Sequence, residues 1–196
     1  YMIPNKPYST SAVVGITGII AVVSWIGALV AGFNLYGRIS LGNIVIVISA
    51  AWLLITVGSA YYIRSNTTDY IAESNIWKLW FWLSIVGIVI NILAGAVVEL
   101  GFVQSQLDVI KTLPMKYGVI LPWLAIYTIG NLATAFYKWD DKEAISTLER
   151  VIYALTGVAS LIGTALLATD PSLHGPMIQA LVVLSLAQIV TLIFRN

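Results

Sequence analysis

Long apolar runs alternate with short polar connections along the whole chain. A helix needs about 20 apolar residues to cross a bilayer, because the hydrocarbon core is ~30 Å thick and each residue rises ~1.5 Å. Six runs reach this length, at roughly 11–36, 43–63, 77–102, 117–137, 148–169 and 176–194. The pattern predicts an all-α, polytopic integral membrane protein with six transmembrane helices in a single transmembrane domain over residues 1–196.

Turn-forming and capping residues stand between the runs. Gly37 lies between the first and second runs, where a glycine favours a turn. We expect Ser74 or Asn75 to cap the third helix and Asp140 or Asp141 to cap the fifth, because short polar side chains can bind the free N–H groups of a first turn.

The composition supports a membrane protein and excludes several classes of function. Apolar residues make up 59% of the chain and charged residues 10%, with a mean hydropathy of +0.91, whereas soluble domains carry about 25% charged residues. Acidic and basic residues share the same loops and give a net charge of +1, so no nucleic-acid-binding patch is expected. Because the chain has no cysteine, it cannot use thiol chemistry or bind an iron–sulfur cluster through cysteine. We expect no cofactor.

The basic residues predict an orientation in the cell membrane. Lysine and arginine near helix ends stay preferentially in the cytoplasm. Three of them fall on one predicted side, namely Arg38, Lys111 and Lys116. The other side holds Lys6, Arg64, Lys78, Lys138, Lys142, Arg150 and Arg195. Both termini are therefore expected to be cytoplasmic.

The tryptophans divide into two groups by their predicted depth. Trp and Tyr concentrate at the membrane interfaces, and Trp123 is expected to join an outer aromatic belt. Trp25 and Trp52 fall near mid-membrane and are expected to touch across the first hairpin, with Ser24 or Ser49 as hydrogen-bond acceptors. Such a contact serves packing, and an aromatic ligand pocket is the alternative.

Similar endings of three runs raise the hypothesis of an internal repeat. The segments 61–64, 135–138 and 192–195 each end in an aromatic residue followed directly or after one residue by a basic one. Three repeated helical hairpins would produce this pattern. The alternative is that any cytoplasmic helix end selects such residues.

One face of the third run carries small and polar residues. Glu99 is the only acidic residue well inside a predicted helix, and it is expected to reach the outer surface or to meet Lys111 or Lys116. A period of four places it on one stripe, which should point into the bundle, with Gly87, Asn91 and Gly95.

Two other runs also carry an amide side chain. These amides and the polar residues of the stripe either specify helix packing or line one polar cavity; the residues are Asn91, Glu99, Asn131 and Gln188. Gly27 and Gly58 are expected to be points of close helix contact, because small residues allow helices to approach.

No nucleotide-binding, metalloprotease or serine-nucleophile motif occurs, so no catalytic activity of the chain's own is expected. The leading hypothesis is a non-catalytic subunit that packs within a larger respiratory or transport complex or a homo-oligomer, with membrane lipids and other subunits or copies as partners. The alternative is a small-solute carrier, a channel or the membrane substrate-binding subunit of a transporter. In helix number and size the chain is similar to the membrane-embedded substrate-binding subunits of vitamin uptake transporters. An enzyme acting on lipid or quinone would require His174 and Glu99 to meet.

Overall fold

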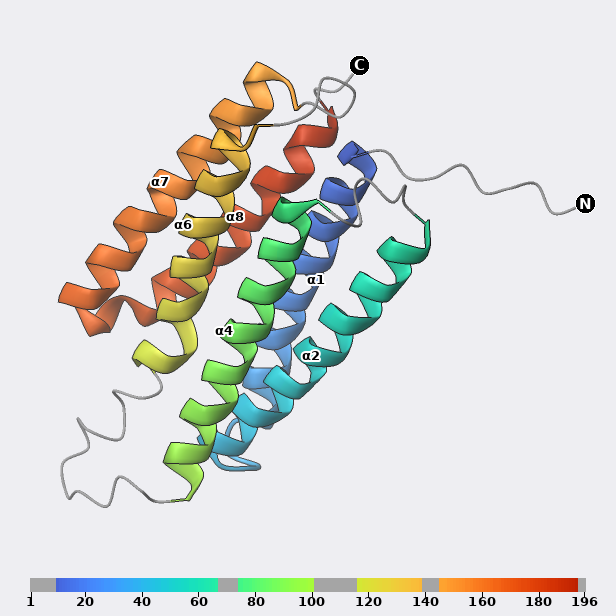
Figure 1. Cartoon of the computed structure of the whole chain (residues 1–196). Helices are drawn as coiled ribbons and strands as arrows, with labels where there is room; N and C mark the ends of the chain where they lie inside the picture. Colours follow the sequence, from blue (N-terminus) through green and yellow to red (C-terminus); the bar gives the residue numbers. More distant parts are fainter. Residues whose placement is uncertain (1–9, 67–73, 101–115, 139–144, 194–196) are drawn as a thin grey trace, which may run out of the picture.

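The computed structural model describes residues 10–66, 74–100, 116–138 and 145–193, without the side chains at 10–14, 116, 171, 174, 188 and 191–193. These segments form a helical bundle (Figure 1). Two short turns accompany the helices: η1 (Lys116–Ile120), a π-helical turn, and η2 (Pro171–Leu173), a 3₁₀ turn. The long helices are α1 (Thr10–Leu35), α2 (Leu41–Asn66), α4 (Asn75–Glu99), α6 (Leu121–Phe136), α7 (Thr147–Thr169) and α8 (His174–Ile193).

Within the described part of the chain, five helical segments are long and apolar enough to cross a membrane. They are Gly15–Leu35, Leu41–Asn66, Asn75–Glu99, Tyr117–Phe136 and Thr147–Thr169, and α8 contributes a shorter apolar stretch, Gly175–Ala187. The expectation of a helical polytopic membrane protein therefore agrees with the structure. The predicted helix bounds differ from the observed ones by three residues or fewer, except at the start of α6, where the π-helical turn η1 stands before Leu121.

Local chemistry explains where the helices begin. Ser74 caps α4 as expected, because its hydroxyl accepts a hydrogen bond from Trp77 N at 3.1 Å. The cap of α7 is Ser146: its hydroxyl accepts from Glu149 N at 3.2 Å, while Glu149 Oε2 accepts from Ser146 N at 2.6 Å. This reciprocal pair closes the first turn of α7. The expectation that Asp140 or Asp141 caps this helix was wrong, because Ser146 is its N-cap residue.

The helices pack in three close pairs. In Figure 1, α1 begins and α8 ends at the same end of the bundle. The most extensive contacts join α6 to α7, α2 to α4, and α1 to α8, whereas α1 and α2 share few. Three consecutive hairpins would instead pair α1 with α2, α4 with α6, and α7 with α8. The internal repeat stays a prediction.

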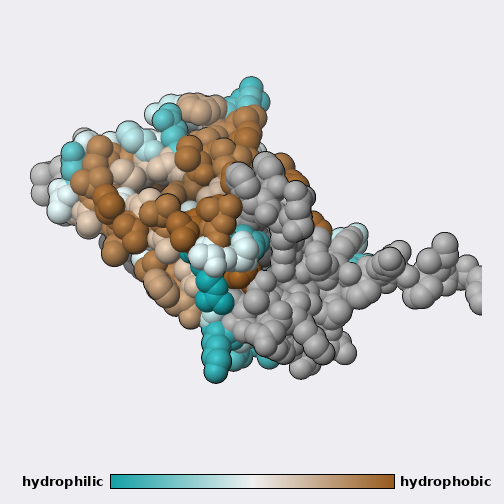
Figure 2. Space-filling model, turned by 90° about the horizontal axis from the view of Figure 1, so that it is seen from above, coloured by the Kyte–Doolittle hydropathy of each residue, from teal (hydrophilic) through white to brown (hydrophobic). Residues whose placement is uncertain are grey.

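The bundle is apolar outside and partly polar inside. Phe33 and Leu54 are 81% and 75% exposed, and hydrophobic residues form a broad part of the described surface seen along the bundle (Figure 2). Asn131, Ser160 and Ser185, by contrast, are completely buried. This arrangement suits a lipid environment, in which apolar side chains face outward and polar groups find partners between helices.

Glycines mark the closest approach between helices. A Cβ at Gly42 would stand 2.6 Å from Gly95 O, so α2 and α4 touch almost backbone to backbone. A Cβ at Gly87 would lie 2.5 Å from Ile126 Cδ1 of α6. Gly87, Asn91 and Gly95 of the stripe on α4 face the bundle, as predicted, whereas Glu99 at its end is exposed. Gly27 and Gly58 do not make such a contact within the described bundle: a Cβ there meets nothing among the described residues within 4 Å, because both glycines are on outward faces.

Candidate functional site

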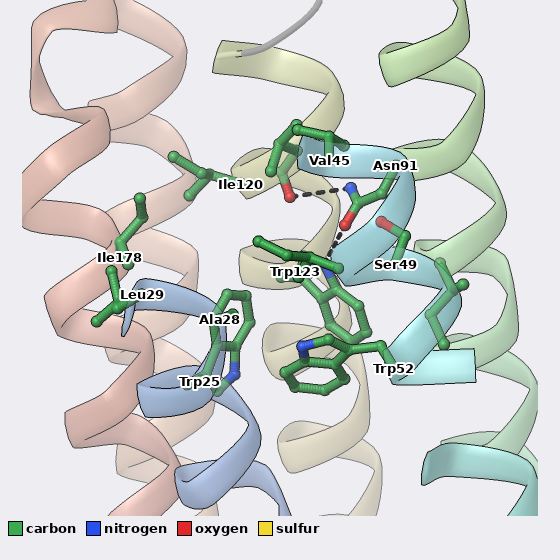
Figure 3. A pocket seen from close by; sticks show the side chains of 13 residues that line it. Trp25, Ala28, Leu29, Val45, Ser49, Trp52, Asn91, Ile120, Trp123 and Ile178 are labelled. Carbon is green, nitrogen blue, oxygen red and sulfur yellow. Dashed lines mark hydrogen bonds between the residues drawn. The ribbon is translucent and has the colours of Figure 1, made fainter. Parts of the chain in front are cut away.

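A cavity of about 130 Å³, cavity A, lies where α1, α2, α4, α6 and α8 converge (Figure 3). Its polar lining consists of the Ser49 hydroxyl, the Asn91 amide and the indoles of three tryptophans. The complete lining is Trp25, Ala28, Leu29, Val45, Ile48, Ser49, Trp52, Ile88, Asn91, Val119, Ile120, Trp123 and Ile178.

Three tryptophans from three helices meet at the cavity. The ring centroids of Trp25 and Trp52 are 5.1 Å apart, those of Trp25 and Trp123 are 5.6 Å apart, and those of Trp52 and Trp123 are 5.0 Å apart. The predicted contact of Trp25 with Trp52 is confirmed. These separations fall within the favourable range for aromatic pairs. The cluster ties α1, α2 and α6 together at the level of the cavity.

Two expectations about these tryptophans were wrong. Trp123 is only 5% exposed and belongs to the cluster rather than to an outer belt, because it lies on the face of α6 that is turned inward. The indole N–H of Trp25 has no hydrogen-bond partner among the described residues, so the expected bond to Ser24 or Ser49 is not formed.

Asn91 links α4 to the start of α6. Its Nδ2 donates to Gly118 O at 2.6 Å and to Val119 O at 3.1 Å, and its Oδ1 accepts from Trp123 Nε1 at 2.7 Å. Pro122 has no N–H, so the carbonyl four residues before it, that of Gly118, lacks its usual donor. The amide of Asn91 supplies that donor. It also holds Trp123 at the cavity wall (Figure 3).

A second cavity of about 100 Å³, cavity B, follows cavity A along the bundle. The part of α1 that lines cavity B is within residues 17–21, and the part that lines cavity A is within residues 25–29. On α4, residues within 77–84 line cavity B, and residues within 88–91 line cavity A. Trp52 and Trp123 line both cavities. The two spaces are therefore stacked, and these two indoles stand between them.

The structure distributes the predicted site residues over different places. Asn91 lines cavity A, whereas Glu99 is exposed at the end of α4 and accepts a hydrogen bond from the Ser40 hydroxyl. Asn131 is buried in α6, where its Nδ2 donates to Tyr127 O at 2.7 Å and its Oδ1 has no partner. Neither Glu99 nor Asn131 lines either cavity. The side chain of Gln188 lies outside the described ones.

The expected neighbours of Glu99 cannot be placed beside it. The side chains of Lys111, Lys116 and His174 lie outside the described ones, so the pairing of Glu99 with a lysine or with His174 stays a prediction. The partner that the structure gives Glu99 is Ser40, in the turn before α2.

Sequence reasoning missed the roles of Trp123 and Ser49 in cavity A. One signal was present: Pro122 and Gly118 mark a place where a helix loses a backbone hydrogen bond and needs a donor from another helix. Trp123 adjoins that place and therefore lies against the helix that supplies the donor.

The chemistry of both cavities is uncharged. No Asp, Glu, Lys, Arg or His lines cavity A or cavity B, and the described residues contain no group of three side chains suited to hold a metal ion. Burying a charge without a partner is costly. The lining therefore favours an uncharged and largely apolar occupant.

Comparisons of the chain with protein families, with curated proteins and with solved structures found no match.

Proposed function

We propose that this chain is the solute-binding protein of a membrane transport system, either a carrier or the membrane substrate-binding subunit of a transporter. In this proposal α8 is the sixth membrane crossing and both termini are cytoplasmic. Cavity A then opens toward the outside and cavity B toward the cytoplasm. The solute is small and uncharged.

The stacked cavities carry this proposal. A carrier needs a binding space near the middle of the membrane and a barrier that can change sides. Cavities A and B lie in series, with Trp52 and Trp123 between them. Helices α1 and α2, which form part of both walls, share few contacts with each other. A small displacement of the α1–α8 pair relative to the α2–α4 pair would change access to the two cavities. It would leave the close packing within each pair intact.

Thiol labelling tests both the topology and the access. The chain has no cysteine, so a single introduced thiol can be labelled without background. We expect Ser49→Cys, in cavity A, to react with a membrane-impermeant methanethiosulfonate reagent applied outside intact cells. We expect Ser59→Cys, in cavity B, to react only when the reagent reaches the cytoplasmic side.

Two further positions serve as controls for the labelling. Ser40→Cys, in the exposed turn before α2, should react from outside, whereas Ser160→Cys, which is completely buried, should not react from either side. The proposal fails if Ser49→Cys and Ser59→Cys are as unreactive as Ser160→Cys in folded protein. Reaction of Ser40→Cys from the cytoplasmic side alone would refute the proposed orientation.

A second candidate, a structural subunit of a larger membrane complex or a homo-oligomer, is favoured by the outward glycines. Small residues in membrane helices usually mark close helix contacts. Gly27 and Gly58 have no such neighbour among the described residues. A helix of another chain would supply the contact. Native mass spectrometry after extraction in mild detergent tests this function: a complex that Gly27→Leu or Gly58→Leu dissociates supports it, and a monomer under the same conditions counts against it.

A further inference from the structure

We infer that cavity A binds an uncharged six-membered ring that carries one hydrogen-bonding oxygen, and that the Ser49 hydroxyl binds this oxygen. This inference rests on the proposed solute binding and names the chemical class of the solute.

The size of cavity A suits a single ring. An apolar cavity of about 150 Å³ in a protein interior accommodates benzene, and cavity A measures about 130 Å³. Three indoles form one side of the space, and aliphatic side chains of α1, α2, α4, η1 and α8 form much of the rest. Aromatic side chains favour stacked or edge-on contacts with another ring. A flat ring therefore fits both the volume and the surface.

Ser49 presents an unused polar group to this space. It is 4% exposed and lines cavity A, yet its hydroxyl forms no hydrogen bond with any residue that the structure describes. Two completely buried serines, Ser160 and Ser185, each donate to the carbonyl four residues earlier at 2.8 Å. A buried hydroxyl without a partner is unfavourable. An oxygen on the ligand would satisfy it.

The Asn91 amide forms the polar wall of cavity A beside Ser49. Both amide hydrogens of Asn91 are used by the carbonyls of Gly118 and Val119, and its Oδ1 accepts from Trp123. The amide is therefore a firmly held part of the wall. Figure 3 shows Ser49 and Asn91 on the same side of the cavity, with the Ser49 hydroxyl directed to the side of Asn91. The oxygen carried by the ligand faces this wall, and the ring of the ligand faces the tryptophans.

Fluorine NMR of two matched probes tests the inference. Fluorobenzene and 4-fluorophenol have the same ring and differ in one hydroxyl group. Each would be titrated into the purified full chain in lipid nanodiscs, and binding would be followed by the broadening of the ¹⁹F signal. We expect Ser49→Ala to weaken 4-fluorophenol binding roughly 2- to 10-fold, the effect of one neutral hydrogen bond, and to leave fluorobenzene unchanged.

Two other variants separate the possible results. Ser59→Ala, which removes a hydroxyl from cavity B, should leave both probes unaffected. Ala28→Leu, which adds three carbons to the lining of cavity A, should weaken both probes at least 10-fold. Thermal unfolding of each variant shows whether it is folded. Competition against 4-fluorophenol shows whether the natural ligand carries an alkyl chain. If 4-octylphenol displaces the probe more strongly than phenol does, the ring is the headgroup of a lipid-soluble molecule. If it displaces the probe more weakly, the ligand is a free solute.

The results distinguish this inference from the proposed function. If Ala28→Leu weakens both probes and Ser49→Ala changes neither, the cavity binds rings and the role of Ser49 is refuted. If neither probe shows binding that Ala28→Leu reduces, cavity A is not a solute site and the proposed function loses its basis. Selective loss of 4-fluorophenol in Ser49→Ala supports the inference.

Discussion

Replacing Asn91 by leucine should strongly destabilise the bundle. The two side chains have the same number of heavy atoms and the same branching at Cγ, so the substitution chiefly removes hydrogen bonds. It leaves Gly118 O, Val119 O and Trp123 Nε1 without the partners that lie at 2.6, 3.1 and 2.7 Å. The carbonyl of Gly118 is the most affected, because Pro122 cannot donate to it.

The size of the effect follows from these three hydrogen bonds. Interhelical hydrogen bonds in membrane proteins contribute ~0.6 kcal/mol on average and up to ~1.7 kcal/mol. Three of them give a loss in the free energy of unfolding of about 2 to 5 kcal/mol for Asn91→Leu. Reversible unfolding in mixed micelles with increasing sodium dodecyl sulfate, followed by far-ultraviolet circular dichroism, measures this loss.

Asn131→Leu is a matched control with the opposite expectation. Asn131 is also buried in a membrane helix, but it makes one hydrogen bond, to the carbonyl of Tyr127 in its own helix, and its Oδ1 is unpaired. Removing an unpaired buried oxygen offsets the loss of that bond, so the free energy of unfolding should change by less than ~1 kcal/mol. The reasoning is refuted if the two variants lose similar stability, or if Asn131→Leu loses more.

Two further substitutions test the packing and the helix caps. Gly42→Ala should destabilise the protein by about 1 to 3 kcal/mol, because its Cβ would press on the Gly95 carbonyl, while Gly27→Ala, with open space around it, should be neutral or stabilising in the same assay. Ser146→Ala should lower the free energy of unfolding by about 1 kcal/mol, because it removes the hydroxyl that binds Glu149 N. Amide hydrogen exchange should become faster only in the first turn of α7. An equal increase along the whole of α7 would contradict this.

The positions of the helices could be predicted from the sequence because membrane thickness sets their length. Their rotation was harder to predict. The period of four placed Asn91 on the inner face of α4 correctly, because glycines marked that face as the one in contact. Gly27 and Gly58 gave the same signal on faces that turn outward. A glycine shows that a helix can approach closely, but not which helix does so.

The candidate site was only partly predictable for the same reason. Trp25 and Trp52 lie at similar distances from the turn between their helices, so their contact could be derived from sequence position. Trp123 comes from a helix more than 60 residues later, and its place depends on how α6 packs against α4. The free hydroxyl of Ser49 depends on side-chain orientation, which no sequence pattern specifies.

The pairing of α1 with α8 has a consequence for how the protein is made. The first helix emerges from the ribosome long before its main partner, because about 140 residues separate the end of α1 from the start of α8. At a synthesis rate of ~5–20 residues per second, α1 waits roughly 10 to 30 s in the bilayer. Any chain that stops before α8 leaves α1 without this contact. Completion of translation, rather than insertion of the first hairpin, therefore closes the bundle.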